Sequence, residues 1–145
     1  ATLHTNDATS AVTRLADMGI EPFLLSSSLL GVLAQRLVRR LCPDCRRSEA
    51  VDPQLGLPPA ITRLYHPVGC PACAHTGYRG RVGIYELLEI TPSLASAIHH
   101  RHNQTQLRTD ASAEGHFRSL QDDGLRWLAS GETSWEELLR VTGQT

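Results

Sequence analysis

The sequence predicts an α/β fold that carries an inserted metal-binding subdomain and a helical C-terminal part. Residues 31–38 are apolar on both alternating faces, which is typical of a strand buried inside an α/β sheet. All four cysteines form two identical Cys-x-x-Cys pairs within residues 41–81. After residue 90, capping residues precede successive apolar stripes of helical period, which favours a run of helices.

The N-terminal part is expected to contain two helices before the strand. Asn6 or Asp7 is a suitable N-cap for the first helix, because its side chain can accept from the free N–H groups of the first turn. Gly19 is expected to end this helix in a left-handed conformation. Pro22 begins a second helix, which runs through about Ser28, since a missing N–H costs nothing at a first-turn position.

The middle of the chain is expected to be mostly loops and turns around the cysteines. Residues 52–59 form a proline-rich loop, and a short helix is predicted near residues 60–64. Residues 77–81 are predicted to form a glycine-containing turn. A strand over residues 82–90 follows, with apolar side chains at alternate positions.

Helices are predicted from residue 91 to the C-terminus. In the helix at residues 119–130, apolar residues recur on one stripe. The last helix begins with a Ser-x-x-Glu capping box that ends at Glu137, and Leu138 and Leu139 are expected to face inward. The expected N-caps are Thr91, Asn103 and Ser134.

Composition excludes several functions. The 145 residues include 41% hydrophobic ones, enough for a core, and the longest apolar stretch, residues 23–38, is interrupted by polar residues, which indicates a soluble protein. The net charge of −1 argues against a general polyanion-binding domain. All 14 basic residues are arginine, so the chain has no phosphate-binding P-loop, which requires lysine. Because residue 1 is not methionine, and a short apolar piece runs directly from it into a helix-start signal, we expect a fragment of a longer protein.

The two cysteine pairs predict one structural zinc site. Two residues between paired thiolates allow a tight knuckle, and a second knuckle completes a tetrahedral four-sulfur shell without an open coordination position. Two disulfides, or a redox-active pair, are the alternatives. The absence of a signal peptide disfavours disulfides, and one Cys-x-x-Cys would suffice for redox chemistry. The predicted ligands are Cys42, Cys45, Cys70 and Cys73.

Other residues also admit two interpretations. His4 lies where a strand is expected to end, a position that opens onto ligand crevices in α/β sheets, although a lone histidine is more often only hydrogen-bonded structure. Arg79 and Arg81 follow the second knuckle and either bind an anionic group or are solvated. Arginines near zinc knuckles also allow a zinc-ribbon nucleic-acid-binding module, but few aromatic residues lie there to stack on bases.

Four segments in order resemble the type II secretion and type IV pilus assembly ATPases. These are Ala-Thr-Leu-His-Thr-Asn-Asp-Ala at residues 1–8, Leu-Ala-Gln-Arg-Leu-Val-Arg at residues 33–39, the four cysteines, and Gly-Tyr-Arg-Gly-Arg-Val-Gly-Ile-Tyr-Glu-Leu at residues 77–87. The resemblance covers essentially the whole chain. Residues 1–8 resemble the family's His box, in which His4 is the named residue.

The resemblance implies a domain organisation and a role. Residues 1–40 would be the C-terminal part of a RecA-like ATPase core, residues 41–81 the tetracysteine zinc-binding subdomain, and residues 82–145 a C-terminal strand and helical subdomain. The full-length protein would be a hexameric motor that uses ATP and Mg²⁺ and drives pseudopilus or pilus assembly. Because the Walker A and Walker B motifs would lie upstream, the chain alone should be inactive.

The resemblance also suggests site residues, partners and location. His4 would act near the γ-phosphate or the attacking water. From their place on a turn just after the metal site, and not from the resemblance, Arg79 and Arg81 are expected to pair with a nucleotide or with a carboxylate of a neighbouring subunit. The tetracysteine module favours secretion or pilus-extension ATPases over retraction ATPases. The expected partners are further copies of the protein and inner-membrane components of the machinery, without nucleic acid. The expected location is cytoplasmic, peripheral at the bacterial inner membrane.

Overall fold

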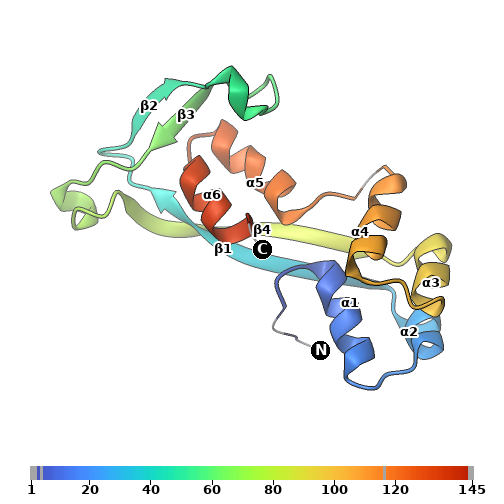
Figure 1. Cartoon of the computed structure of the whole chain (residues 1–145). Coiled ribbons are helices and arrows are strands. Elements are labelled where there is room, and N and C mark those ends of the chain that lie inside the picture. Colours follow the sequence, from blue (N-terminus) through green and yellow to red (C-terminus); the bar gives the residue numbers. More distant parts are fainter. Residues whose placement is uncertain (1–2, 4, 116, 144–145) are drawn as a thin grey trace. The chain divides into compact units, whose positions relative to one another are not determined.

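The structure is a computed structural model that describes residues 3, 5–115 and 117–143. The chain forms two units, each built from two segments that are distant in sequence: Ala1–Gln35 with Tyr85–Leu120, and Arg36–Ile84 with Gln121–Thr145. The elements, in chain order (Figure 1), are α1 Ala8–Asp17, α2 Pro22–Ser28, β1 Gly31–Leu41, β2 Arg47–Ala50, η1 Pro53–Leu55, β3 Arg63–His66, η2 Pro71–Cys73, β4 Tyr78–Glu89, α3 Pro92–His99, α4 Gln104–Ala113, α5 Leu120–Ala129 and α6 Trp135–Thr142.

The described strands form two two-stranded sheets. β1 pairs with β4, and the N–H of Ile90 donates to the carbonyl of Leu30 at 3.0 Å where this pair begins. β2 and β3 are antiparallel, with Arg47 opposite His66 and Ala50 opposite Arg63. The fold is therefore mixed α/β, as predicted, and both long strands pass from one unit into the other.

The first unit has a core formed by its helices and the strand segments beside them. The N-cap Asp7 accepts from Ser10 N, and Ser10 in turn accepts from Asp7 N, so α1 begins with a complete capping box. Apolar faces of α1 to α4 then pack with Leu88 of β4. The buried core residues are Ala8, Val12, Leu25, Leu88, Leu94, Ala97, Ile98, Leu107 and Ala111.

The second unit has a separate buried set around α5 and α6. Leu128 and Leu138 are fully buried, as are Val38 and Ile84. Gly124 allows the close approach of α6, because a Cβ at this position would lie 2.3 Å from a Leu138 methyl carbon. A side chain larger than hydrogen at residue 124 would displace this contact.

Most of the predicted helices are confirmed. Asp7, Thr91 and Asn103 act as the N-caps of α1, α3 and α4, as predicted, and Asn103 also forms a capping box with Gln106. Pro22 occupies the first turn of α2. The local capping chemistry therefore determined these helix starts. The predicted strand end at residues 1–3 lies mostly outside the described residues.

Three local predictions are wrong. The short helix predicted near residues 60–64 is absent, because residues from Arg63 onward form β3 and bond to β2 across the chain. The predicted turn at residues 77–81 belongs mainly to β4, which begins at Tyr78 and accommodates Gly80 at φ +82°. Leu139 is 40% exposed, so only Leu138 of that pair faces inward.

The strand predicted at residues 31–38 is present and extends to Leu41, but one of its faces is uncovered. In the first unit, Leu33 of β1 and Leu87 of β4 are 64% and 61% exposed, while Leu88 is buried. The prediction of burial on both faces is therefore wrong for the described chain, because its sheet is covered on one side only. Among the described helices, none combines the length and apolar character needed to cross a membrane.

Replacing Leu138 by alanine should destabilise the second unit by about 3 kcal/mol, because the change removes a fully buried side chain. Leu139→Ala is the matched control and should cost less than about 1 kcal/mol, since this neighbour is partly exposed. Both tryptophans, Trp127 and Trp135, lie in this unit, so urea unfolding followed by tryptophan fluorescence reports on it. Equal losses in the two variants would contradict the assigned orientation of α6.

Candidate metal centre

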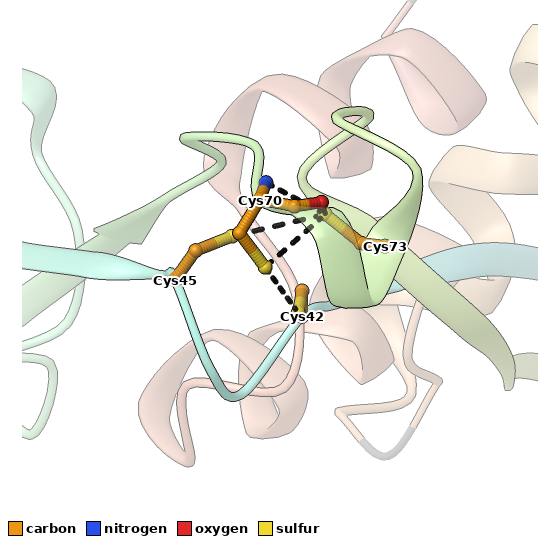
Figure 2. A group of neighbouring side chains, drawn as sticks. All are labelled: Cys42, Cys45, Cys70 and Cys73. Carbon is orange, nitrogen blue, oxygen red and sulfur yellow. Dashed lines mark hydrogen bonds between the residues drawn. The ribbon is translucent and has the colours of Figure 1, made fainter.

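The four cysteine sulfurs converge on one point in the second unit (Figure 2). Cys42 and Cys45 follow β1, while Cys70 and Cys73 lie at η2, just before β4. The Sγ–Sγ distances are 3.8 Å for Cys42–Cys70 and 3.9 Å for both Cys45–Cys73 and Cys70–Cys73. All four sulfur atoms lie within 4.8 Å of one another. The predicted residues are thus brought together as a single cluster.

Backbone hydrogen bonds connect the two knuckles. The N–H of Cys42 donates to the carbonyl of Gly77 at 2.9 Å, and the N–H of Arg46 closes the first knuckle by donating to Cys42 O at 3.1 Å. Gly77 has φ +82°, and a Cβ there would lie 2.4 Å from Cβ of Pro67. A glycine is therefore required where the second knuckle leads into β4.

The second knuckle has an unusual backbone conformation. Ala74 and His75 have φ values of 53° and 63°, in the left-handed region that non-glycine residues rarely adopt. Backbone N–H groups on both sides of this knuckle face sulfur: Gly69 N donates to Cys45 Sγ at 3.3 Å, and Gly77 N donates to Cys73 Sγ at 3.2 Å. Such donors favour thiolates over thiols and orient them for a cation.

The sulfur atoms do not share one electrostatic environment. Burial raises the pKa of the Cys70 thiol to about 11. Burial alone would also raise the pKa of Cys73, but the N–H groups of Cys70 and Gly77 donate to its sulfur and lower that pKa to about 6. Packing several thiolates together is unfavourable without a positive charge between them.

This donor set fits one tetrahedral zinc ion. A zinc–sulfur bond of about 2.3 Å gives tetrahedron edges of about 3.8 Å, close to the three distances above. No disulfide joins the four cysteines, all of which are free thiols. Four thiolates would complete the metal's coordination shell, so a zinc ion here would supply structure and not a reactive position.

Contacts from the first knuckle to the turn between α5 and α6 were not predicted from sequence. The guanidinium of Arg46 donates to the carbonyl of Gly131 and lies 4.9 Å from the ring centre of Tyr65. The N–H of Leu41 also donates to the carbonyl of Glu132 at 2.8 Å. The cysteine-bearing segment is therefore continuous in its packing with the C-terminal helices of the second unit.

Glu137 forms an ion-pair network beside this segment. Its side chain is fully buried and accepts from the backbone N–H of Arg39 at 2.8 Å, from the Arg39 guanidinium at 2.9 Å and from Arg140 at 2.7 Å. Burial alone would raise the pKa of Glu137, but these hydrogen bonds outweigh burial and lower the pKa to about 2. Glu137 was expected to complete a capping box with Ser134. That prediction is wrong in its reciprocal half, because Arg39 and Arg140 occupy the carboxylate.

The remaining predicted site residues are less defined. Arg79 and Arg81 are exposed on β4, and within the described part of the chain neither side chain forms a hydrogen bond or ion pair. His4 lies outside the described residues. The residues that follow it, including Thr5 and Asn6, line a shallow polar hollow of about 260 Å³ together with α1. The structure therefore assigns no shared site to His4 and the two arginines.

Comparison with known proteins identifies the class. The model of the family described as "Type II/IV secretion system protein" matches residues 1–140. The chain is 56% identical over 98% of its length to the type II secretion system protein HxcR of Pseudomonas aeruginosa. It is 51% identical over its full length to the type II secretion system ATPase E of Vibrio cholerae. It spans 28% and 29% of the lengths of these two relatives.

These matches place the chain in the class of type II and type IV secretion system proteins. The chain belongs to the Type II/IV secretion system protein family, as the four ordered motifs indicated. A further relative, the type II secretion system protein E of Pectobacterium carotovorum, is 51% identical over 98% of the chain. Membership favours the secretion interpretation over a zinc-ribbon nucleic-acid-binding module or a redox protein.

Replacing Glu137 by glutamine should destabilise the second unit by about 2 kcal/mol at pH 7, because two arginines lose their buried charge partner. A lowered pKa in the folded protein means that this stabilisation is complete above the ordinary glutamate pKa of about 4.3 and is lost as the pH falls toward about 2. The difference between wild type and Glu137→Gln should therefore shrink in urea titrations from pH 5 to pH 2.5.

The control for this titration is Glu136→Gln, which alters an exposed neighbouring carboxylate 3.3 Å from His66 Nδ1. It should change stability by less than about 1 kcal/mol. A difference between wild type and Glu137→Gln that stays constant across this pH range would show that Glu137 is not held ionised by its arginine partners.

Proposed function

We propose that the full-length protein is an ATP-hydrolysing motor of type II secretion, or of the related assembly of type IV pili. The observation that carries this proposal is the identity of about half of all residues, over nearly the whole chain, to type II secretion proteins that include one named an ATPase. The chain contains no lysine and hence no P-loop. By itself it is proposed to be inactive, with the phosphate-binding and Walker B residues supplied by the longer protein.

The proposed organisation has three parts: a RecA-like segment at residues 1–40, a zinc subdomain at residues 41–81 and a strand with helices at residues 82–145. The uncovered face of the β1–β4 sheet supports the first assignment, because Leu33 and Leu87 are exposed apolar residues on a sheet that has two strands among the described residues. In a RecA-like core, other parts of the longer protein would cover such a face.

The proposed cofactors are a structural zinc ion in this chain and ATP with Mg²⁺ in the whole protein. The convergence of Cys42, Cys45, Cys70 and Cys73 at 3.8–3.9 Å supports zinc. Zinc would hold the start of β4, which carries Arg79 and Arg81, against the end of β1. These arginines are proposed to pair with a nucleotide or with a carboxylate of a neighbouring subunit, which their exposure permits.

The proposed motor is a hexamer at the cytoplasmic side of the inner membrane, in contact with membrane components of the machinery. His4 is proposed to act on the γ-phosphate or the attacking water. The polar hollow beside Thr5 and Asn6 supports this assignment, because it gives polar groups access to the segment that follows His4. An imidazole there would contribute to the transition state more than to nucleotide binding.

The purified protein should contain one zinc ion per chain by elemental analysis. Cys70→Ser should lose the metal after dialysis, because it removes one of four sulfur ligands. Asp44→Asn is the matched control within the first knuckle and should retain one zinc per chain, since it leaves all four sulfurs in place. Metal-free wild-type protein, purified under reducing conditions, would refute the zinc assignment.

In the full-length protein, His4→Ala should lower kcat for ATP hydrolysis on the order of 100-fold while KM for ATP changes less than about threefold. Arg81→Ala should weaken nucleotide affinity or hexamer formation. His99→Ala, which removes an exposed histidine of α3, is the control and should retain wild-type turnover. Steady-state kinetics and size-exclusion chromatography measure these effects. Wild-type kcat in His4→Ala would remove His4 from the mechanism.

A further inference from the structure

Glu86 is a charged residue in the interior of the first unit. It lies on β4 between Ile84 and Leu88, at a position that faces the core, and is only 1% exposed. Burying a carboxylate is costly unless hydrogen bonds compensate, and an apolar residue at this position would continue the buried stripe of the strand. A carboxylate at this position is therefore tolerated only if its oxygens accept hydrogen bonds.

Both oxygens of Glu86 accept hydrogen bonds from helix starts. Oε2 accepts from the N–H of Ala8 at 2.7 Å, and Oε1 accepts from the N–H of Leu120 at 3.1 Å. Ala8 is the first residue of α1, and Leu120 is the first residue of α5. N–H groups at helix starts have no partner within their own helix and favour a negative charge. One carboxylate thus accepts hydrogen bonds from the first N–H groups of two helices that are far apart in sequence.

A second charged contact holds the start of α1 from another element. Asp7, the N-cap of α1, pairs with the guanidinium of Arg108 from α4, which also reaches the hydroxyl of Thr9. Burial raises the pKa of Glu86, and the nearby charge of Asp7 adds to this effect, while the N–H groups of Ala8 and Leu120 oppose it. The first turn of α1 is therefore held by two elements that lie more than 70 residues further along the chain.

The anchored turn is directly connected to the segment that contains His4. The hydroxyl of Thr5 donates to the carbonyl of Asp7 at 3.2 Å, so the backbone between Thr5 and Ala8 is tied to the anchored helix start. His4 is the next residue toward the N-terminus. A displacement of Ala8 would therefore also shift the backbone as far as Thr5, which the hydrogen bond to Asp7 ties to this turn.

We propose that Glu86 is a positioning residue for ATP hydrolysis, which holds in place the first turn of α1, the element that follows His4 in the chain. This inference rests on the proposed function, in which His4 acts on the γ-phosphate or the attacking water. Glu86 itself does not contact the nucleotide in this scheme. It acts through Ala8 and the connection from Asp7 to Thr5.

The test uses the full-length protein and the substitution Glu86→Gln. The amide keeps an oxygen for one N–H but turns its own NH₂ toward the other, so one of the two anchoring bonds is lost. We expect kcat to fall about tenfold with KM for ATP changed less than about threefold, since misplacement of a reacting group lowers the rate more than binding. Hydrogen exchange of the Ala8 and Thr9 amides should become faster.

The matched control is Ile98→Val, which removes one buried methylene from α3 in the same unit without altering a hydrogen bond to α1. It should keep kcat within about twofold of wild type. If Glu86→Gln does not fold, Arg108→Gln loosens the same helix start through the partly exposed ion pair with Asp7 and should lower kcat in the same direction.

The decisive comparison is the double variant of His4→Ala with Glu86→Gln. If Glu86 acts through His4, the double variant should be no slower than His4→Ala alone. The inference would be overturned if the kcat losses of His4→Ala and Glu86→Gln multiplied in the double variant, or if Ile98→Val lowered kcat as much as Glu86→Gln. Glu86 would then be a purely structural residue. Wild-type turnover in His4→Ala would instead refute the proposed role of His4, and with it the positioning role, so the two failures are distinguishable.

Discussion

The convergence of four sulfur atoms is the constraint on which the second unit depends. Two knuckles 28 residues apart place their sulfurs at 3.8–3.9 Å, a spacing at which thiolates repel one another unless a cation lies between them. Backbone N–H groups of Gly69, Cys70 and Gly77 point at these sulfurs. The end of β1 and the start of β4 are thereby held together. This contact fixes the start of β4, the strand that carries the exposed Arg79 and Arg81.

Each unit also contains a buried carboxylate that joins distant segments. In the first unit, Glu86 accepts from the backbone of Ala8 and Leu120, whereas in the second unit Glu137 accepts from Arg39 and Arg140. The environments of the two carboxylates shift their pKa values in opposite directions. Among the described residues Glu86 has no direct cationic partner, and burial raises its pKa, while two guanidinium groups lower the pKa of Glu137 to about 2. Glu86 therefore binds the N-termini of two helices, whereas Glu137 is the shared acceptor of two arginines in an ion-pair network.

One face of the β1–β4 sheet is uncovered in this chain, which spans less than a third of the length of its relatives. Leu33 and Leu87 are large apolar side chains that are exposed on this face. The relatives are more than three times as long as the matched region. A two-stranded sheet with one apolar face exposed is incomplete as a core, which is consistent with the RecA-like organisation proposed above.

Sequence alone determined the features that depend on neighbouring residues. The N-caps Asp7, Thr91 and Asn103, the proline start of α2 and the Cys-x-x-Cys knuckles were all predictable, because capping bonds and tight turns form within a few positions of the chain. The family resemblance likewise rested on short motifs that can be recognised locally, and the comparisons confirmed it.

Tertiary structure decided the features that depend on distant partners. The segment predicted as a helix near residues 60–64 leads into β3, because ladder hydrogen bonds to β2 outweigh weak local helix preference. Glu137 matched a capping box in sequence, yet Arg39, 98 residues away, binds its carboxylate. In the sequence, Glu86 is one polar position within a largely apolar strand. Its hydrogen-bond partners lie 78 and 34 residues away, so only the folded chain reveals its two acceptor contacts.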